Sequence, residues 1–345
     1  MGTRPRETRM FAAAFAMDPA RFADVYGPEA RARVAAQAEL VADPADRAGV
    51  WSAERLAAEP DTAASALHDV EVLLTGWGGP VLDARMLDRL PRLRLVLYAA
   101  GSVRRIATEE FWAAGIPIVS AAHANALPVA EFTVAQIVYA LKDGWRHVLA
   151  ARAARAPVRV GRAPGAYGSV VGVLSLGATG RLVCERLRGY DVQVLAHDPY
   201  AEAPPGVRSV GLDELFATAD VVSVHAPLTA ETRGLVGHRL LASMKPGATL
   251  LNTSRGAVLD EPALLDVLAR RPDLFAVLDV TDPEPPIPGS PLFTLPNVVV
   301  TPHLAGSQAL ERRRLGDLVV SEFERWTAGE PLHWALDRSA YERMA

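Results

Sequence analysis

The sequence predicts an α/β protein in which two domains each carry a wound parallel sheet. Three observations lead to this prediction. At 345 residues the chain exceeds the size at which one hydrophobic core usually stops growing. Apolar residues make up 50% of the chain and charged residues 22%, the balance of an ordinary globular protein. Short apolar runs alternate with helical patterns, which is typical of parallel sheets covered by helices on both faces.

The first half of the chain contains five candidate strands, mostly separated by helical patterns. They are Phe11–Phe15, Glu39–Ala42, Val70–Thr75, Leu93–Tyr98 and Ile116–Val119. A long helix is predicted from about Pro128 to Ala151, because apolar side chains recur there at helical spacing. Residues 156–168 contain proline and glycine and are interpreted as a connection.

The second half contains a sharper series of strands. They are Val170–Leu174, Val192–Ala196, Val221–His225, Thr249–Asn252, Phe275–Asp279 and Val298–Thr301. Six strands at these intervals match the dinucleotide-binding fold. A final helix is expected from about Gln308 to Thr327.

Composition and net charge exclude several classes of binding partner. The formal net charge is -4 and both signs are interspersed, so nothing in the chain favours nucleic acid or an anionic membrane surface. No stretch approaches the roughly 18 apolar residues of a membrane span. The single cysteine, Cys184, excludes an internal disulfide, and its helical surroundings predict a buried apolar role. We expect a cytoplasmic protein that acts on small molecules and holds no metal.

A turn containing glycines follows the first strand of the second half. The strand Val170–Leu174 runs directly into Ser175–Gly180 and then into a helical pattern. Such a strand, turn and helix cradle a pyrophosphate on backbone N–H groups. Gly177 allows the backbone to approach the phosphates, and Gly180 allows close packing of helix on strand. Ser175 replaces the first glycine of the usual fingerprint, so a Cβ must be fitted into the tight turn.

An acidic residue follows the next strand, as this fold requires. Asp198 lies eighteen residues beyond Gly180, where a carboxylate accepts hydrogen bonds from the adenosine ribose and repels a 2′-phosphate. This position favours NAD over NADP as the cofactor. The alternative is that Asp198 and Pro199 simply open a turn.

Three further segments complete a recognisable pattern. They are VVSVHAPLTAETRG (Val221–Gly234), MKPGATLLNTSRGAVLD (Met244–Asp260) and AVLDVTDPEPPIPGSPLFTLPNVVVTPHLAG (Ala276–Gly306). With the glycine turn, they make the second half similar to the D-isomer-specific 2-hydroxyacid dehydrogenase family. The resemblance implies a Rossmann NAD-binding domain of residues 122–306 and a flavodoxin-like substrate domain of residues 1–121 plus 307–345. It also implies a homodimer and hydride transfer between NAD(H) and C2 of a 2-hydroxy or 2-keto acid.

The resemblance assigns the reactive centre to three polar residues. Arg255 follows a strand end, where its guanidinium can hold a substrate carboxylate through two hydrogen bonds and polarise the neighbouring carbonyl. His303 also follows a strand, and a histidine, whose ordinary pKa is about 6.5, can give or take the proton of the C2 oxygen at neutral pH. Glu284 is the expected partner of His303, because a carboxylate beside an imidazole sets its tautomer.

The resemblance also implies binding residues. For the cofactor they are Gly177, Ala178, Thr179, Gly180, Asp198, Pro199, His225, Pro227, Thr232, Thr253, Asp279 and Gly306. Asp279 is expected beside the nicotinamide carboxamide, whereas His225 serves equally well as a cap on a strand end. For the substrate they are Gly101, Ser102, Arg255 and His303.

The substrate loop departs from the family pattern. Family members usually carry Gly-X-Asp there, but Ala99–Arg105 has no aspartate. Backbone N–H groups of Gly101 and Ser102 remain able to bind an anion. Arg104 and Arg105 suggest a substrate with a second anionic group, although two solvated arginines are an equally good interpretation.

Two functions remain open from the sequence. The intact set of Arg255, Glu284 and His303 favours an NAD-dependent dehydrogenase or 2-ketoacid reductase. The same fold also serves NAD-sensing binding proteins, as in transcriptional corepressors that resemble this family, and the fold cannot separate the two.

Overall fold

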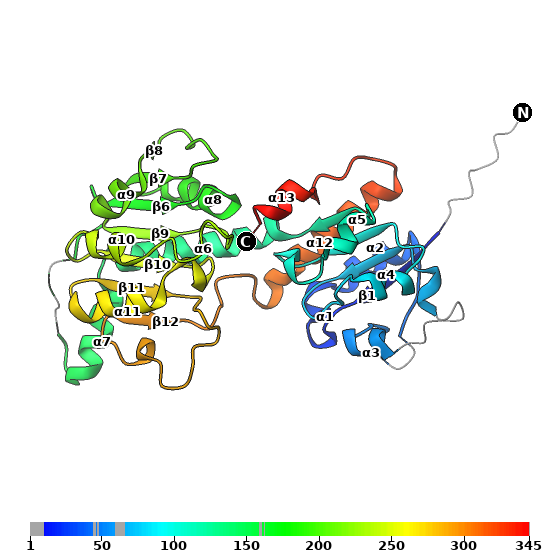
Figure 1. Cartoon of the computed structure of the whole chain (residues 1–345), viewed down its shortest axis with the longest axis horizontal. Helices are drawn as coiled ribbons and strands as arrows, with labels where there is room; N and C mark the ends of the chain where they lie inside the picture. The colour runs from blue at the N-terminus through cyan, green and yellow to red at the C-terminus, as the bar shows by residue number, and fades with distance from the viewer. Residues whose placement is uncertain are drawn as a thin grey trace, which may run out of the picture. The chain divides into compact units, whose positions relative to one another are not determined.

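The computed structural model of the chain describes residues 10–43, 46, 48–58, 66–158, 161 and 163–344. The chain forms two compact units, coloured along the sequence in Figure 1. Unit 1 comprises Met1–Asn125 with Gln308–Met344, and unit 2 comprises Ala126–Ser307. Each unit contains its own sheet and its own core. The predicted α/β fold with two parallel sheets is confirmed.

The sheet of unit 1 has the strand order β13-β5-β4-β3-β1-β2. Its strands are β1 (Phe11–Ala16), β2 (Ala38–Leu40), β3 (Val72–Thr75), β4 (Leu95–Tyr98), β5 (Ile118–Ser120) and β13 (Ala335–Leu336). The first five pair in parallel in a flavodoxin-like order, and the five predicted strands are confirmed. The sequence did not predict β13, which has two residues and pairs antiparallel with β5.

Helices cover both faces of this sheet, because alternate strand residues are buried on opposite sides. Leu74 and Leu97 pack with Val319 and Phe323 on one side, whereas Leu73 lies in the core on the other side. The α-helices are α1 (Pro19–Val25), α2 (Pro28–Ala35), α3 (Ala53–Ala58), α4 (Ala84–Arg89), α5 (Glu109–Ala113), α12 (Arg313–Thr327) and α13 (Arg338–Glu342). Short 3₁₀ turns are η1 (Ala66–Asp69), η2 (Val103–Arg105) and η5 (Ala309–Arg312).

The predicted final helix was wrong in its first turn. Residues Ala309–Arg312 form the 3₁₀ turn η5, and the α-helix begins at Arg313. Gln308 and Glu311 form a reciprocal capping box that satisfies the exposed N–H groups of this turn.

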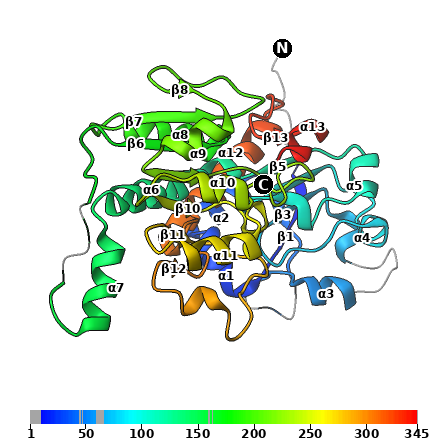
Figure 2. The same cartoon turned by 60° about the vertical axis from the view of Figure 1, so that its left-hand side comes forward.

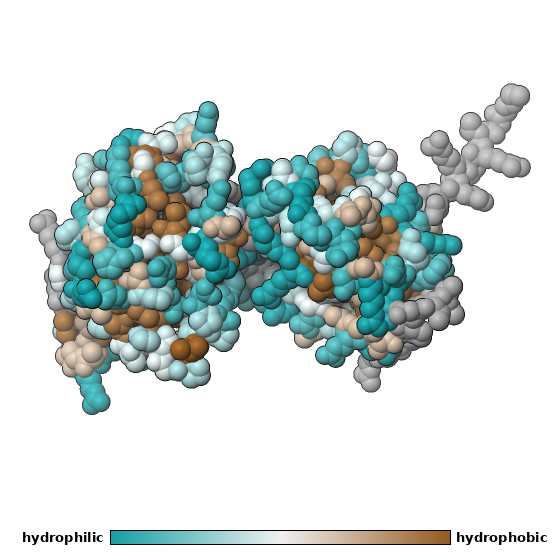
Figure 3. All heavy atoms as spheres, viewed as in Figure 1, coloured by the Kyte–Doolittle hydropathy of each residue, from teal (hydrophilic) through white to brown (hydrophobic). Residues whose placement is uncertain are grey.

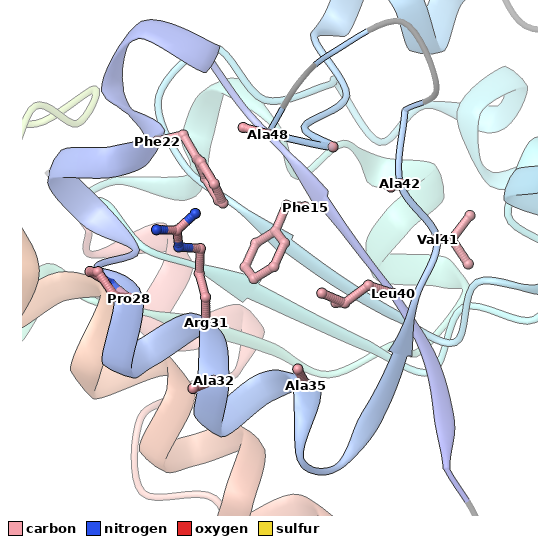
Figure 4. Close-up of a pocket in the computed structure, with 11 residues that line it drawn as sticks. Phe15, Phe22, Pro28, Arg31, Ala32, Ala35, Leu40, Val41, Ala42 and Ala48 are labelled. Carbon is pink, nitrogen blue, oxygen red and sulfur yellow. The ribbon is translucent and has the colours of Figure 1, made fainter.

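A pocket of about 370 Å³ lies in unit 1 between β1, α1 and α2 (Figure 4). Phe15, Phe22 and Leu40 give it an apolar lining, and the Arg31 guanidinium carbon lies 5.6 Å from the centre of the Phe22 ring. None of the site residues predicted from the sequence lines it.

The sheet of unit 2 has the order β12-β11-β10-β9-β6-β7-β8, and all its pairs are parallel. The strands are β6 (Val170–Leu174), β7 (Gln193–His197), β8 (Arg208–Ser209), β9 (Val221–Val224), β10 (Thr249–Asn252), β11 (Phe275–Leu278) and β12 (Val298–Val300). This is the Rossmann order with one strand added at the β12 edge. The six predicted strands are confirmed, whereas the exposed two-residue β8 was not predicted.

Two groups of helices cover the sheet of unit 2 (Figure 2). Side chains of α9 (Leu212–Thr218), α10 (His238–Ser243) and α11 (Glu261–Arg270) share one core. Those of α6 (Ala122–Ala140) and α8 (Ala178–Leu187) share the other, which contains Cys184. Cys184 is buried in that core, which confirms its predicted apolar role, and burial raises its pKa to about 11.

The single helix predicted from Pro128 to Ala151 was wrong. The helical run starts earlier, at Ala122, and breaks into α6 and α7 (Gly144–Ala154). Asp143 adopts the left-handed conformation at the break, with φ of 51°, and the two helix axes differ by 62°. In Figure 2, α7 turns away from the direction of α6. Side chains at helical spacing continue across the break, so periodicity alone conceals it.

Within the described ranges, no single helix is long and apolar enough to cross a membrane, and only the bent pair α6 and α7 passes that test together. The face shown in Figure 3 carries polar residues with apolar ones scattered among them.

Candidate active site

The three residues predicted to react follow three neighbouring strands of unit 2. The strands β10, β11 and β12 lie side by side in the sheet. Arg255 follows β10, Glu284 follows β11 and His303 follows β12. Parallel strands present their carboxyl ends at one edge of the sheet. The three residues therefore come after the strand ends at which ligands bind in open α/β sheets.

His303 and Glu284 form a direct pair. The imidazole Nδ1 lies 2.5 Å from the Glu284 Oε1. The two side chains keep 48% and 40% of their surface exposed, so the pair is open to solvent. Since an ionised carboxylate only accepts hydrogen bonds, Nδ1 carries the shared proton and Nε2 is left to exchange a proton with a ligand.

The turn that carries His303 is held by Asp279. His303 adopts φ of 52°, a left-handed conformation that is uncommon outside glycine. The buried Asp279 carboxylate accepts hydrogen bonds from the Thr301 hydroxyl at 2.6 Å and from the N–H groups of Leu304 and Ala305, each at 2.9 Å. The His303 N–H also donates to the Asp279 carbonyl at 3.0 Å. Asp279 therefore orients His303, a role that the sequence did not reveal.

A buried asparagine builds the turn that carries Arg255. The Asn252 side chain accepts hydrogen bonds from the Ser254 N–H at 3.0 Å and hydroxyl at 2.8 Å, and donates to the Arg255 carbonyl at 2.9 Å. Arg255 itself is half-buried, and its Nη1 donates to the Ser254 carbonyl at 2.7 Å. A Cβ on Gly256 would lie 2.0 Å from the Thr281 backbone, so glycine is required there. Asn252 was missed as a site residue although it lies in the segment Met244–Asp260, which carries part of the family resemblance.

The turn after β6 has the geometry expected of a phosphate cradle. Helix α8 begins at Ala178 with Gly177 as its N-cap, and Thr179 lies in its first turn. A Cβ on Gly177 would meet no atom within 4 Å, whereas one on Gly180 would lie 2.0 Å from the Ser175 carbonyl oxygen. Gly180 is thus required by packing, while Gly177 leaves open space at the positive end of a helix.

Ser175 and Asp198 are linked in this turn. Ser175 adopts φ of 78°, the left-handed conformation that the usual glycine adopts without strain. The Asp198 carboxylate accepts hydrogen bonds from the Ser175 hydroxyl at 3.2 Å and the Leu176 N–H at 2.6 Å. Its other oxygen accepts a hydrogen bond from the Tyr200 N–H at 2.8 Å. Pro199, between Asp198 and Tyr200 in the sequence, is exposed. A carboxylate has about four acceptor positions, so Asp198 retains capacity for a ribose hydroxyl.

The other predicted cofactor residues lie in three places. Pro227 and Thr232 belong to one loop, in which the Thr232 hydroxyl donates to the Pro227 carbonyl. The Thr253 hydroxyl lies 3.0 Å from that of Thr133, which joins the β10 turn to α6. Gly306 is half-buried after the His303 turn.

His225 is buried at the end of β9. Its Nε2 lies 2.8 Å from the Ser223 hydroxyl, and its Nδ1 is buried without a hydrogen-bond partner among the described residues. Burial lowers the pKa of His225 to about 4. The ring therefore stays uncharged at neutral pH, with one nitrogen as a donor and the other as an acceptor.

This burial predicts an acid-sensitive stability. The unfolded chain protonates His225 near pH 6.5, but the folded chain protonates it only near pH 4. Below the higher value the unfolded state binds more protons, so the free energy of unfolding falls as the pH drops, by about 3 kcal/mol in total. We expect His225→Gln to lose less stability than the wild type between pH 7 and pH 4 in urea unfolding. His333→Gln, at an exposed histidine, should keep the wild-type slope; equal slopes in all three proteins would contradict the prediction.

The predicted substrate loop lies in unit 1, between β4 and η2. The buried Ser120 hydroxyl, at the end of β5, donates to the Gly101 carbonyl at 2.6 Å and lies 3.4 Å from the Ala100 carbonyl. In a trans peptide the C=O and N–H point in opposite directions. The N–H groups of Gly101 and Ser102 therefore point away from Ser120, as an anion site on this loop requires. The sequence gives no sign of this role for Ser120.

Arg104 does not have the free guanidinium that the second-anion hypothesis needs. Its Nε donates to the Met344 carbonyl at 2.8 Å, and its Nη2 donates to the Glu342 carbonyl at 2.7 Å. Arg105 is exposed. Among the described residues, no group of three or more histidine, cysteine, aspartate or glutamate side chains is arranged to hold a metal ion.

Fold and site together define the class of two-domain α/β proteins with a dinucleotide-binding unit. Residues 139–305 match the family model described as D-isomer specific 2-hydroxyacid dehydrogenase, NAD binding domain. The chain is 32% identical over 275 residues to a glyoxylate reductase of Korarchaeum cryptofilum, covering 76% of this chain and 82% of that protein. The chain belongs to the D-isomer specific 2-hydroxyacid dehydrogenase family.

Other known proteins agree with this membership. The chain is 34% identical over 278 residues to D-3-phosphoglycerate dehydrogenase of Mycobacterium bovis, covering 78% of this chain and 52% of that protein. It thus spans about half the length of the first curated relatives it matches. A D-isomer specific 2-hydroxyacid dehydrogenase structure from Xanthobacter autotrophicus, in complex with NADPH and MES, superposes with a TM-score of 0.77 at 25% identity, over 96% of this chain and 100% of that one.

Proposed function

We propose that the protein is an NAD-dependent oxidoreductase that interconverts a 2-hydroxy acid and the corresponding 2-keto acid. The observation that carries the proposal is the His303–Glu284 pair, with Nδ1 and Oε1 2.5 Å apart. Arg255 follows β10, which is separated in the sheet by β11 alone from β12, the strand before His303. A proton-transfer group and a carboxylate-binding group at one sheet edge are what oxidation at the carbon next to a carboxylate requires.

The residues of unit 2 fit a dinucleotide cofactor. The open space at Gly177 and the N-terminus of α8 suit a pyrophosphate, and Asp198 suits a ribose hydroxyl. When bound, NAD(H) supplies or accepts the hydride. Because a carboxylate repels a 2′-phosphate, Asp198 supports NAD in preference to NADP.

The chain's own groups divide the remaining work. In the reduction direction, protonated His303 donates a proton from Nε2 to the C2 oxygen, and Glu284 stabilises the ring charge before the transfer. In the oxidation direction, neutral His303 accepts that proton. Arg255 holds the substrate carboxylate and polarises the carbonyl. In unit 1, the N–H groups of Gly101 and Ser102 are donors that suit a carboxylate. On this proposal unit 2 binds NAD.

The names of the relatives support short 2-keto acids as substrates. One relative is a glyoxylate reductase and another a D-3-phosphoglycerate dehydrogenase. We extend the proposal to D-specificity, a homodimer and a cytoplasmic location, as the family resemblance implies. Light scattering of the purified protein tests the dimer.

A spectrophotometric screen tests the activity. NADH and NADPH are each offered with 2-keto acids that differ in length and in the number of anionic groups. We expect oxidation of NADH with at least one of them, and kcat/KM at least about tenfold higher with NADH than with NADPH, equivalent to about 1.4 kcal/mol. Chiral chromatography of the product should give the D-isomer. Binding of NADH without turnover of any acid would contradict the proposal and favour a sensing role.

A further inference from the structure

Loop 101–105 of unit 1 is attached to a segment more than 230 residues away in the sequence. Arg104 spans the gap with two hydrogen bonds, to the carbonyls of Glu342 and Met344. Its guanidinium carbon also lies 5.2 Å from the centre of the Tyr341 ring. The Val103 N–H approaches the Met344 sulfur at 3.4 Å. These contacts join the loop to the end of α13.

The C-terminal segment is itself anchored at two further places in unit 1. At the first, β13 pairs with β5, the strand whose last residue, Ser120, holds the Gly101 carbonyl. At the second, Arg338 of α13 forms a two-pronged ion pair with Glu109, at 2.7 and 2.8 Å. Because Glu109 begins α5, the segment joins α5 to β5, the two elements that follow the loop in the sequence.

Aromatic packing adds to these anchors. The Tyr341 ring centre lies 5.0 Å from that of Trp112 on α5, and the Tyr341 hydroxyl donates to the Ala107 carbonyl at 3.4 Å. Leu336, Tyr341 and Met344 pack against a core cluster that contains Val103. Ion pairing, hydrogen bonding and burial thus act together on one short stretch of chain.

Arginine suits this attachment because of its shape. The last carbonyl groups of a helix have no partner within the helix and carry partial negative charge. A planar guanidinium donates to two oxygens at once, whereas a lysine ammonium acts as a point charge. Arg104 therefore binds the Glu342 carbonyl at the end of α13 together with the Met344 carbonyl beyond it.

We propose that the segment Ala335–Met344, attached through Arg104, positions the 101–105 loop so that its main-chain N–H groups bind the substrate carboxylate. Arg104 is thus a positioning residue, and the C-terminal segment contributes to substrate affinity without touching the substrate. The substrate half of this inference rests on the proposed function. The attachment of the loop to the segment does not.

The test compares Arg104→Ala, Arg104→Lys, a chain that ends at Leu336, and the combination of Arg104→Ala with that truncation. For the 2-keto acid found by the screen, we expect Arg104→Ala to raise KM about tenfold while kcat and the KM for NADH stay within twofold. Arg104→Lys should recover only part of the affinity. The combination should raise KM no further than the truncation alone does, because both changes remove the same attachment.

Hydrogen exchange of the full-length protein gives a readout that needs no turnover. We expect amides of residues 99–106 to exchange faster in Arg104→Ala, while those of unit 2 are unchanged. Arg343→Ala, at an exposed arginine that contacts Ser339 within the segment, is the matched control and should change neither exchange nor KM.

Three results would overturn the inference. One is Arg104→Ala with wild-type exchange in the loop. The second is a rise in KM confined to substrates with two anionic groups, which would indicate direct contact with the ligand. The third is faster exchange in the loop together with an unchanged KM for every acid. Absence of turnover with all acids would instead contradict the proposed function, and the exchange experiment would still decide whether the segment holds the loop.

Discussion

Replacing His303 with asparagine is expected to lower kcat about 10³-fold, within the range of about 10² to 10⁴ for loss of a general acid–base group. Asparagine is smaller and keeps a polar side chain on the turn that Asp279 stabilises, but it has no titratable proton at neutral pH. Hydride transfer then proceeds without matched proton transfer at the C2 oxygen. Stopped-flow measurement of NADH oxidation at saturating substrate gives the loss directly.

Two controls show whether the loss belongs to proton transfer. His238→Asn, at a histidine of the same unit with 57% of its side chain exposed, should retain wild-type kcat. The dissociation constant of NADH, measured by fluorescence, should stay within threefold in His303→Asn. A kcat for His303→Asn within threefold of the wild type would show that another group transfers the proton.

Glu284→Gln is expected to show a smaller loss within the same experiment, about 10- to 100-fold in kcat. The amide still accepts a hydrogen bond from Nδ1, so the ring keeps its orientation, but the positive charge on the ring loses its counterion. A larger loss in Glu284→Gln than in His303→Asn would reverse the proposed roles of the two residues.

Replacing Arg255 with lysine is the second large effect and is expected to lower kcat/KM for the 2-keto acid about 10²- to 10³-fold. Lysine keeps the charge but loses the planar fork that holds a carboxylate through two hydrogen bonds. One hydrogen bond to a charged group contributes about 1.5–3 kcal/mol, and polarisation of the carbonyl in the transition state adds to it. Steady-state kinetics with varied 2-keto acid measures the loss.

The division of this loss between kcat and KM tests the role of Arg255. A group that binds substrate and transition state equally would raise KM alone, whereas one that also polarises the carbonyl lowers kcat as well, and we expect both. Arg270→Lys, at an arginine with 74% of its side chain exposed, is the matched control and should match the wild type. If Arg255→Lys left kcat/KM within fivefold of wild type, the fork would not be the carboxylate site.

The strands of both sheets could be predicted because parallel strands buried on both faces leave continuous apolar runs in the sequence. All four residues of β3 are buried, and so are all four of β11. The strands β8 and β13 have two residues each and carry mainly exposed side chains, so they leave no such run. The break between α6 and α7 was missed for a related reason, since it depends on the left-handed conformation of Asp143 and leaves the apolar spacing intact.

Motif residues of the candidate site were predicted, but their supports were not. Asp279 was predicted beside the cofactor, but not as the residue whose carboxylate holds the His303 turn through three hydrogen bonds. Asp279, Ser120 and Arg104 each bond to main-chain atoms of another segment. Such a bond constrains the identity of the residue that supplies the side chain, but not that of its partner. A sequence pattern therefore records the residue that acts more clearly than the one that holds it.

The sequence by itself determined the α/β class, the glycine turn at Gly177 and Gly180, and the order of Arg255, Glu284 and His303, because each depends on local pattern or spacing. The family resemblance also implied the pairing of Glu284 with His303, to which the structure adds the contact of 2.5 Å between Nδ1 and Oε1. Only the tertiary structure decided which supporting groups meet, and it brings Arg104 to Met344 across 240 residues. Such meetings depend on the path of the whole chain between the two partners, which no local pattern encodes.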